Sequence, residues 1–323
     1  MPIYLAIDAG GTSTRCALAD QDRVLARAFT GSVKLMRVSE PEATARLHAM
    51  LAEVAASAAV PLSQITRTCF GLAGLTIPAV RAWATRAISE KIPGPLILCG
   101  DEEIALDAAF AAGPGILVIA GTGSNIVGRT PSGDLVGAGG WGPVLGDDGA
   151  GYWIGLEAIR AALRAQDAAP AHLAPEDPSA ALLAAIQLHW NLDSLAALIE
   201  YGNHRGDANR PAPDFASLAP VVAHCAEQGN PIAAAILRSA GCELAGQVAL
   251  VARKIAEAST PPGSDLEPGP ATLEIAFTGS VLTHIAAVRA AMVARLGQTL
   301  PAARVQPAPV DPLDGALFRA RRA

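Results

Sequence analysis

Two short glycine-containing turns carry residue types that can bind phosphate. The first is Asp8-Ala-Gly-Gly-Thr-Ser-Thr14 and the second is Gly121-Thr-Gly-Ser124. Glycines let backbone N–H groups approach phosphate oxygens, and hydroxyl side chains add further donors. Asp8 can hold a hydrated Mg²⁺, because this ion prefers carboxylate oxygens and keeps several of its waters. The pattern predicts a phosphate and magnesium site built from Asp8, Gly10, Gly11, Thr12, Ser13, Gly121, Thr122 and Gly123.

The two glycine turns are flanked by similar apolar segments. Apolar runs that read as strands precede and follow each of them, at residues 4–8 and 15–19 and again at 116–120 and 125–128. Ala120 takes the place of Asp8 in the second copy. One such turn could be an ordinary glycine hairpin. Two of them, more than a hundred residues apart, indicate an internal duplication, and phosphate-binding turns that close on a nucleotide meet the needs of phosphoryl transfer.

Asp101 is the candidate general base. It follows the apolar run 95–99 and begins a helical pattern, which places its carboxylate at the end of a sheet strand, where α/β folds bind ligands. A carboxylate there can accept the proton of a hydroxyl that attacks a phosphate. The competing interpretation is a helix N-cap, which Glu102 and Glu103 would complement.

The elements that must position these residues alternate between strands and helices. Further strands are predicted near residues 68–72, 95–99 and 273–277, and helices near 40–59, 79–92, 102–111, 157–165, 179–189, 192–201, 215–228, 231–258 and from 281. Residues 260–270, rich in Pro and Gly, are predicted to form an exposed loop. This pattern predicts an α/β protein with lobes at 1–114 and 115–310, and with 311–323 packing back on the first lobe.

Composition narrows the classes of function. A chain of 323 residues, 51% hydrophobic and 17% charged, fits two packed domains. The net charge of −6 disfavours nucleic acid as a partner, and no apolar run approaches the ~20 residues that a membrane span requires. No signal peptide is recognised at the start, so a cytoplasmic location is expected. The five cysteines contain no CxxC, and the six histidines show no metal-binding spacing.

Four segments together resemble the N-acetylglucosamine kinase and BadF/BadG/BcrA/BcrD ATPase family of the actin/hexokinase/heat-shock ATPase superfamily. They are LAIDAGGTSTR, ILVIAGTGSNIVG, GGWGPVLGDDGAGYWIG and IAFTGSVL, and the resemblance runs from Tyr4 to about Phe318. It implies a two-lobed, ribonuclease H-like fold with duplicated domains around an ATP cleft. It also implies ATP and Mg²⁺ as cofactors and assigns the place of the family's catalytic aspartate to Asp101.

The resemblance also implies a sugar-binding loop and an adenosine site. The sugar pocket would be lined by Ser124, Asn125, Gly140, Trp141, Gly142 and Asp147, and the nucleotide would contact Gly229, Gly279 and Ser280. The chain departs from the family pattern at Asp148 and Ala150, where glutamate and serine are expected. It departs again at Lys34, which stands where the family has an asparagine that contacts the sugar.

The expected activity is transfer of the γ-phosphate of MgATP to a hydroxyl of an amino sugar, O6 of N-acetylglucosamine or glucosamine. An N-acetylmuramic acid/N-acetylglucosamine kinase of cell-wall recycling is an alternative, because Lys34 could pair with a lactyl carboxylate. A BadF-type activator ATPase is another, although it needs paired cysteines for an iron–sulfur cluster. A sugar-sensing regulator would need an added DNA-binding domain, and an actin-like filament has no use for a sugar loop. The oligomeric state, including a homodimer, stays open.

Overall fold

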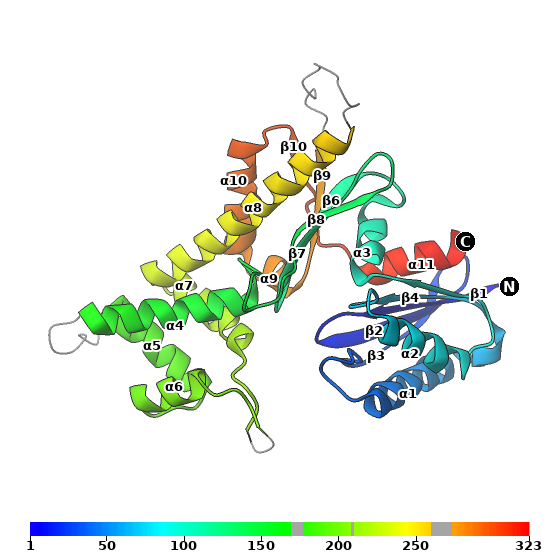
Figure 1. The fold of residues 1–323 in the computed structure, drawn as a ribbon, viewed down its shortest axis with the longest axis horizontal. Coiled ribbons are helices and arrows are strands. Elements are labelled where there is room, and N and C mark those ends of the chain that lie inside the picture. Colours follow the sequence, from blue (N-terminus) through cyan, green and yellow to red (C-terminus); the bar gives the residue numbers. More distant parts are fainter. Residues whose placement is uncertain (169–176, 208–209, 260–272, 323) are drawn as a thin grey trace. The chain divides into compact units, whose positions relative to one another are not determined.

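The computed structural model describes residues 1–168, 177–207, 210–259 and 273–322, drawn in Figure 1. The chain divides into two compact units. The first comprises Met1–Leu117, Arg129–Leu135 and Val310–Ala323, and the second comprises Val118–Gly128 and Val136–Pro309. The predicted loop at 260–270 lies outside the described residues.

The first unit is built on a mixed five-stranded sheet in the order β3-β2-β1-β4-β5. Its strands are β1 (Ile3–Ala9), β2 (Ser13–Ala19), β3 (Val24–Gly31), β4 (Ile65–Leu72) and β5 (Leu96–Cys99). β2 is antiparallel to both β1 and β3, whereas β4 is parallel to β1 and β5 is parallel to β4. The carboxyl ends of β1, β3, β4 and β5 therefore meet at one edge of the sheet.

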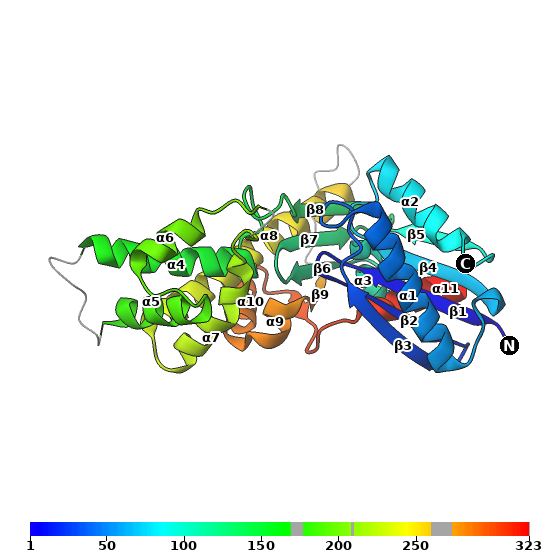
Figure 2. The same cartoon turned by 90° about the horizontal axis from the view of Figure 1, so that it is seen from below.

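Both faces of this sheet are covered by helices (Figure 2). The helices are α1 (Glu40–Ala58), α2 (Pro78–Ser89), α3 (Asp101–Phe110) and α11 (Pro312–Arg322), with a short 3₁₀ turn at Leu62–Gln64. Along β1, Leu5 and Ile7 pack in a core with α1 and α2, while Tyr4 and Ala6 pack with α3 and α11. Because successive side chains point to opposite faces, a strand covered on both sides reads as a continuous apolar run.

Local signals explain where two of these helices begin. Ser39 caps α1, and its Oγ accepts a hydrogen bond from the Glu42 amide at 3.4 Å. Gly100 is the N-cap of α3, so Asp101 is the first helical residue and does not itself cap the helix. The Glu103 side chain accepts a hydrogen bond from the Gly100 amide at 3.0 Å. The N-cap interpretation of Asp101 is thereby excluded.

The second sheet repeats the plan of the first, with the order β10-β9-β6-β7-β8. Its strands are β6 (Gly115–Ala120), β7 (Ser124–Arg129), β8 (Leu135–Gly139), β9 (Leu273–Thr278) and β10 (Ala303–Val305). Reading β8-β7-β6-β9-β10 against β3-β2-β1-β4-β5 matches each strand with its counterpart in chain order. The duplication predicted from the two glycine turns is confirmed.

The second unit is the more helical one, as expected. Its helices are α4 (Gly151–Ala168), α5 (Pro178–His189), α6 (Leu195–Gly202), α7 (Ala219–Glu227), α8 (Pro231–Ser259), α9 (Ser280–His284) and α10 (Ala286–Thr299), with a 3₁₀ turn at Phe215–Leu218. α4 begins at Gly151, earlier than the pattern near Glu157 predicts, because the turn before it passes directly into the helix.

α8 has the length and apolar composition of a membrane-crossing helix, and it is the one helix of this kind in the described part of the chain. A row of its residues from Ala233 to Ile255 is buried. Gly241 lets α10 approach closely, because a Cβ atom there would lie 2.4 Å from the Val288 carbonyl oxygen. These features are those of a core helix in a folded domain.

Candidate active site

The first glycine turn joins β1 to β2 and is open around its glycines. An added Cβ at Gly11 would meet no atom within 4 Å, and one at Gly10 would come no closer than 3.9 Å to another residue. Neither residue has a positive φ angle. Packing and backbone conformation therefore do not require glycine at these positions.

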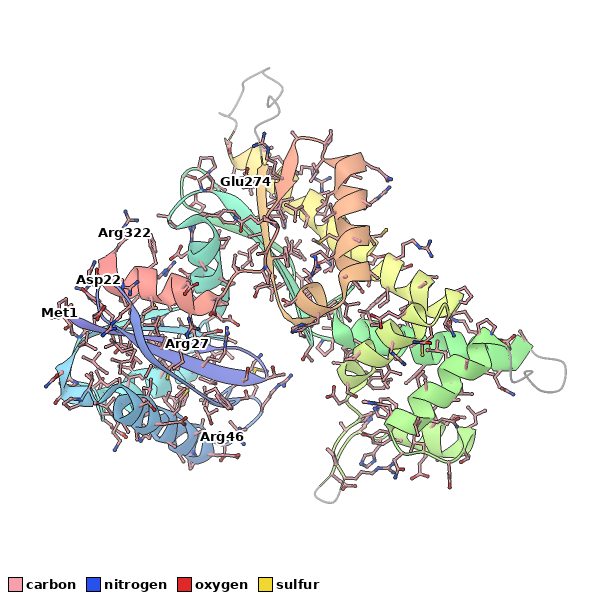
Figure 3. All side chains as sticks on the ribbon, turned by 180° about the vertical axis from the view of Figure 1, so that it is seen from behind. Met1, Asp22, Arg27, Arg46, Glu274 and Arg322 are labelled. Carbon is pink, nitrogen blue, oxygen red and sulfur yellow. The ribbon has the colours of Figure 1, made fainter. Side chains whose placement is uncertain are left out.

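Asp8 lies at the carboxyl end of β1 and is held by an arginine. The Arg15 guanidinium donates to Asp8 Oδ2 at 2.6 Å and also lies 3.2 Å from Asp311, which Arg27 contacts at 2.9 Å. Figure 3 labels Arg27 on its strand. Burial raises the pKa of Asp8 above its ordinary value, and Arg15 opposes that effect. The sequence analysis missed Arg15, although it stands directly after the motif.

Asp8 suits magnesium as one of several ligands. Mg²⁺ is usually bound through one or two carboxylates together with substrate phosphates and waters. Among the described residues no group of three or more His, Cys, Asp or Glu side chains could enclose a metal ion. Asp8 therefore fits a Mg²⁺ ion that is also bound by phosphate oxygens. In the structure, Arg15 balances the charge of the Asp8 carboxylate.

Asp101 lies at the same sheet edge as Asp8. Only Gly100 separates it from β5, which is parallel to β4, and β4 is parallel to β1. Burial raises the pKa of Asp101 to about 8, with further contributions from a hydrogen bond to Glu102 and from the charges of Glu102 and Asp8. A carboxyl with a pKa near the working pH is suited to general-base catalysis. Glu102, named from the sequence only as a complement to a helix N-cap, thus raises the pKa of the candidate base.

Lys34 follows β3 and belongs to the same edge. Ser32 fixes this loop against the first glycine turn, since its Oγ donates to the Gly11 carbonyl at 3.1 Å and accepts from the Lys34 amide at 3.2 Å. Arg46, labelled in Figure 3, donates to the Ser32 carbonyl at 2.7 Å. Asp8, Asp101 and Lys34 are therefore brought to one edge of the first sheet.

The second glycine turn is packed tightly. The Gly151 amide donates to the Gly121 carbonyl at 2.8 Å, so the start of α4 holds the turn. A Cβ at Gly123 would lie 2.3 Å from Asp147 Oδ2, and one at Gly279 would lie 2.3 Å from the Ala120 carbonyl oxygen. Gly279 also has a φ angle of +96°. Close contacts therefore favour glycine at positions 123 and 279, whereas a Cβ at Gly121 would come no closer than 3.6 Å to another residue.

Beside this turn is a cavity of about 360 Å³ within the second unit. Its lining includes Gly121, Thr122 and Ser280, which the sequence assigns to nucleotide binding, and adds residues of α7, of α9 and around the Phe215–Leu218 turn that had not been predicted. Those additions include Asp214, Ser217, His224, Glu227 and His284. Gly229 is not among the lining residues; it has a φ angle of +86° and turns the chain between α7 and α8. No spacing in the sequence connects residues from these separate elements.

The sugar-loop residues of the second unit also come together. Ser124 Oγ donates to the Asp148 carbonyl at 3.1 Å, and the Gly142 amide donates to Asp147 Oδ1 at 3.2 Å. A Cβ at Gly140 would lie 2.9 Å from Asn125 Oδ1. Asp147 is buried and has a positive φ of 59°, a conformation that is uncommon for residues other than glycine. Trp141 differs from these neighbours because 74% of it is exposed.

With this geometry established, similarity to known proteins defines the class. The chain belongs to the BadF/BadG/BcrA/BcrD ATPase family, whose model matches residues 5–318. It is 31% identical over 250 residues to an N-acetylmuramic acid/N-acetylglucosamine kinase of Clostridium acetobutylicum, covering 76% of this chain and 77% of that protein.

Solved structures agree on the fold. A candidate N-acetylglucosamine kinase from Chromobacterium violaceum superposes with a TM-score of 0.72 at 26% identity, covering 98% of both chains. A ROK family glucokinase from Streptomyces griseus, solved with glucose and AMPPNP, superposes with a TM-score of 0.59 at 15% identity over 99% of both chains, which bears on the fold alone. The predicted hexokinase-like α/β fold and sugar-kinase class are confirmed, and the family implies the use of ATP.

Proposed function

We propose that this protein is a MgATP-dependent amino-sugar kinase that phosphorylates O6 of N-acetylglucosamine or glucosamine, with Asp101 as the general base. The observation that carries the proposal is the placement of Asp101 and Asp8 at one edge of the first sheet. The names of the Clostridium and Chromobacterium proteins support an amino sugar as the acceptor.

In the proposed reaction, Asp101 accepts the proton of the sugar hydroxyl as its oxygen forms a bond to the γ-phosphorus. The bond between that phosphorus and the bridging oxygen of ADP breaks, and ADP leaves with the electron pair. Asp8 would hold the magnesium ion, which neutralises charge on the phosphates. The open turn at Gly10 and Gly11 would donate backbone hydrogen bonds to phosphate oxygens, and Ser280 would line the nucleoside cavity.

A substrate screen tests this proposal. The purified protein is incubated with MgATP and glucosamine, N-acetylglucosamine, N-acetylmuramic acid, N-acetylmannosamine or glucose, and ADP and sugar phosphate are both quantified. We expect equal amounts of ADP and a 6-phosphate from at least one hexosamine. ADP release that no sugar stimulates would contradict the proposal and favour the activator-type ATPase.

N-Acetylmuramic acid is a second candidate substrate. Lys34 supplies a cation at the edge that holds Asp101, and the Clostridium relative is named for both sugars. Lys34→Asn should lower the ratio of kcat/KM for N-acetylmuramic acid over N-acetylglucosamine by roughly tenfold, because an ion pair in a partly open site contributes about 1–2 kcal/mol. Arg37→Asn, a change at an exposed cation of the same loop, is the control. An unchanged ratio of the two kcat/KM values would show that Lys34 does not bind the lactyl carboxylate of N-acetylmuramic acid.

A further inference from the structure

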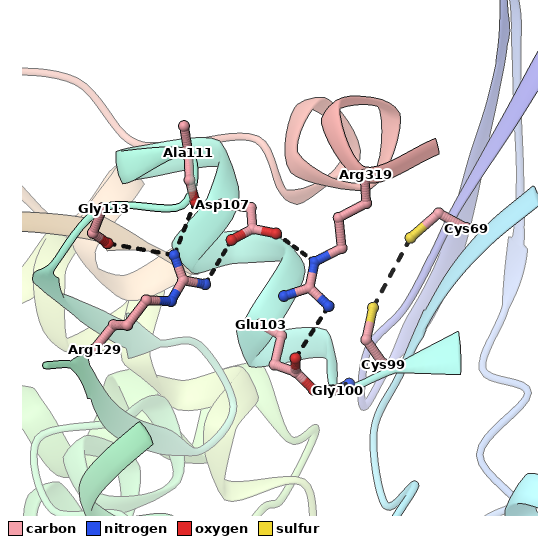
Figure 4. Close-up of polar contacts among 9 residues, drawn as sticks. All are labelled: Cys69, Cys99, Gly100, Glu103, Asp107, Ala111, Gly113, Arg129 and Arg319. Carbon is pink, nitrogen blue, oxygen red and sulfur yellow. Dashed lines mark hydrogen bonds and ion pairs between the residues drawn. The ribbon is translucent and has the colours of Figure 1, made fainter. Parts of the chain in front are cut away.

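The helix that begins with Asp101 is held by a group of charges near the C-terminal helix, of which Asp107 and Arg129 are buried and Glu103 and Arg319 are half-buried. Asp107 of α3 is almost fully buried and contacts two arginines, Arg129 at 2.5 Å and Arg319 of α11. Arg319 also lies 3.0 Å from Glu103, one turn back along α3. Figure 4 shows the four side chains in a continuous network. Two carboxylates are matched by two guanidinium groups, which a buried cluster of charges requires.

The network reaches both ends of α3. At the carboxyl end, Arg129 donates to the carbonyls of Ala111 and Gly113 at 2.8 and 3.3 Å. At the amino end, Glu103 lies between Arg319 and Gly100 and accepts the Gly100 amide hydrogen at 3.0 Å (Figure 4). Gly100 is the residue directly before Asp101. A chain of contacts thus runs from Arg319 through Glu103 to the backbone that orients the candidate base.

Packing supports the same role for this part of the molecule. A Cβ at Gly315 of α11 would lie 1.7 Å from the Ile104 carbonyl oxygen, so the two helices are in direct backbone contact. A Cβ at Gly71 of β4 would lie 2.2 Å from Ile104 Cδ1, which leaves α3 no room on its other side. Glu103 contacts the first turn of α3 through the Gly100 amide, so a displacement of Glu103 would be felt at the Asp101 carboxylate.

We propose that Arg319 is a positioning residue, which acts through Glu103 and the Gly100 amide to orient Asp101 for proton transfer. The inference rests on the proposed role of Asp101 as base. Arg319 also neutralises Glu103, so this carboxylate does not add its charge to Glu102 and Asp8 near the base. The contact is not evident from sequence, because Arg319 and Glu103 lie more than two hundred residues apart.

Kinetics with MgATP and N-acetylglucosamine test the proposal. Arg319→Gln should lower kcat by roughly 10- to 100-fold, the scale of loss for a catalytic group displaced by about 1 Å, while KM for both substrates stays within about threefold. Arg319→Lys should restore part of kcat. The control is Arg321→Gln, since Arg321 anchors the same helix to the Asp20 carbonyl at 2.8 and 3.1 Å but does not reach α3. An Arg319→Gln kcat no lower than that of the control overturns the proposal.

The pathway through Glu103 and Asp101 is tested by double variants. Adding Arg319→Gln to Glu103→Ala, or to Asp101→Asn, should lower kcat no further than the single change does. A full additional loss in either background would show that Arg319 acts elsewhere. Wild-type turnover by Asp101→Asn alone would instead refute the assigned base, which separates the failure of the proposed function from the failure of this inference.

Amide hydrogen exchange provides a measurement that needs no turnover. The Gly100 amide should exchange roughly tenfold faster in Arg319→Gln, because its acceptor Glu103 is no longer held, and at the wild-type rate in Arg321→Gln. If Arg319→Gln does not fold, Glu103→Ala takes its place in both measurements. Unchanged protection of Gly100 in Arg319→Gln, or an unchanged kcat in Glu103→Ala, contradicts the proposal.

Discussion

The two glycine turns share one hairpin design but are stabilised by different forces. In the first, Gly10 and Gly11 have open space around them, and the charged side chains of Asp8 and Arg15 lie at the end of the strand. In the second, Ala120 replaces Asp8, a Cβ at Gly123 would meet the Asp147 carboxylate, and Gly279, which follows β9, lies against the Ala120 backbone beside the turn. The first turn lies beside the Asp8–Arg15 ion pair, and the second turn forms part of the wall of a cavity. Packing therefore does not require glycine in the first turn, whereas close contacts favour glycine at Gly123 and at Gly279 beside the second turn.

The largest effect is expected at the charged edge of the first unit. Asp101→Asn should lower kcat by roughly two to four orders of magnitude, the range for loss of a general base, with little change in ATP binding. Steady-state kinetics and calorimetric titration of ATP measure the two quantities. Turnover near the wild-type rate would remove Asp101 from the mechanism.

The same variant should be at least as stable as the wild type. Because the pKa of Asp101 in the folded protein is about 8 and its ordinary value is 3.8, the unfolded chain ionises first as the pH rises. Stability from this group is therefore lost between about pH 4 and pH 8. Thermal unfolding at pH 8 should give Asp101→Asn an equal or higher Tm. A lower Tm would mean that the carboxyl has a structural role that outweighs this cost.

Asp8→Ala removes the charge that distinguishes the first turn from the second. We expect the Mg²⁺-dependent part of ATP affinity to fall by roughly tenfold or more, since even the outer-shell partners of a metal contribute 10- to 100-fold. ATP is titrated with and without Mg²⁺. Asp22→Ala, an exposed carboxylate between β2 and β3, is the control. An unchanged magnesium dependence would show that the two turns do not differ in metal binding.

A matched pair of glycine substitutions sharpens the contrast in packing. Gly279→Ala should lower Tm by roughly 5 °C or more, because it combines a positive φ with a backbone clash. Gly11→Ala should leave Tm almost unchanged but weaken ATP binding. Scanning calorimetry and ATP titration distinguish them. A large loss of Tm in Gly11→Ala would mean that the first turn also needs glycine for packing.

The smallest effect concerns the pH dependence of the first unit. The kcat/KM profile should rise with pH through a midpoint near 8, because Asp101 must be ionised to accept a proton. Glu102→Gln should move this midpoint to lower pH, since the hydrogen bond and charge of Glu102 raise the pKa of Asp101. The kcat/KM profiles of the wild type and of Glu102→Gln are measured from roughly pH 5 to pH 10, a range that includes the expected midpoint. Coincident midpoints would show that Glu102 does not affect the base.

Local sequence determined the repeated hairpins, the strand before Asp101 and the helix opened by Ser39, because these features depend on the alternation of apolar residues, on glycine turns and on capping. Asp8 and Asp101 could be expected at one edge because strands of an α/β sheet end together. The partners of these residues could not be predicted. Arg319 reaches Glu103 and Asp311 reaches Arg15 only after α11 packs on the first sheet, and charge pairs between distant segments leave no periodic pattern in a sequence. The cavity beside the second glycine turn likewise joins side chains from separate helices, so only the tertiary structure decided its lining.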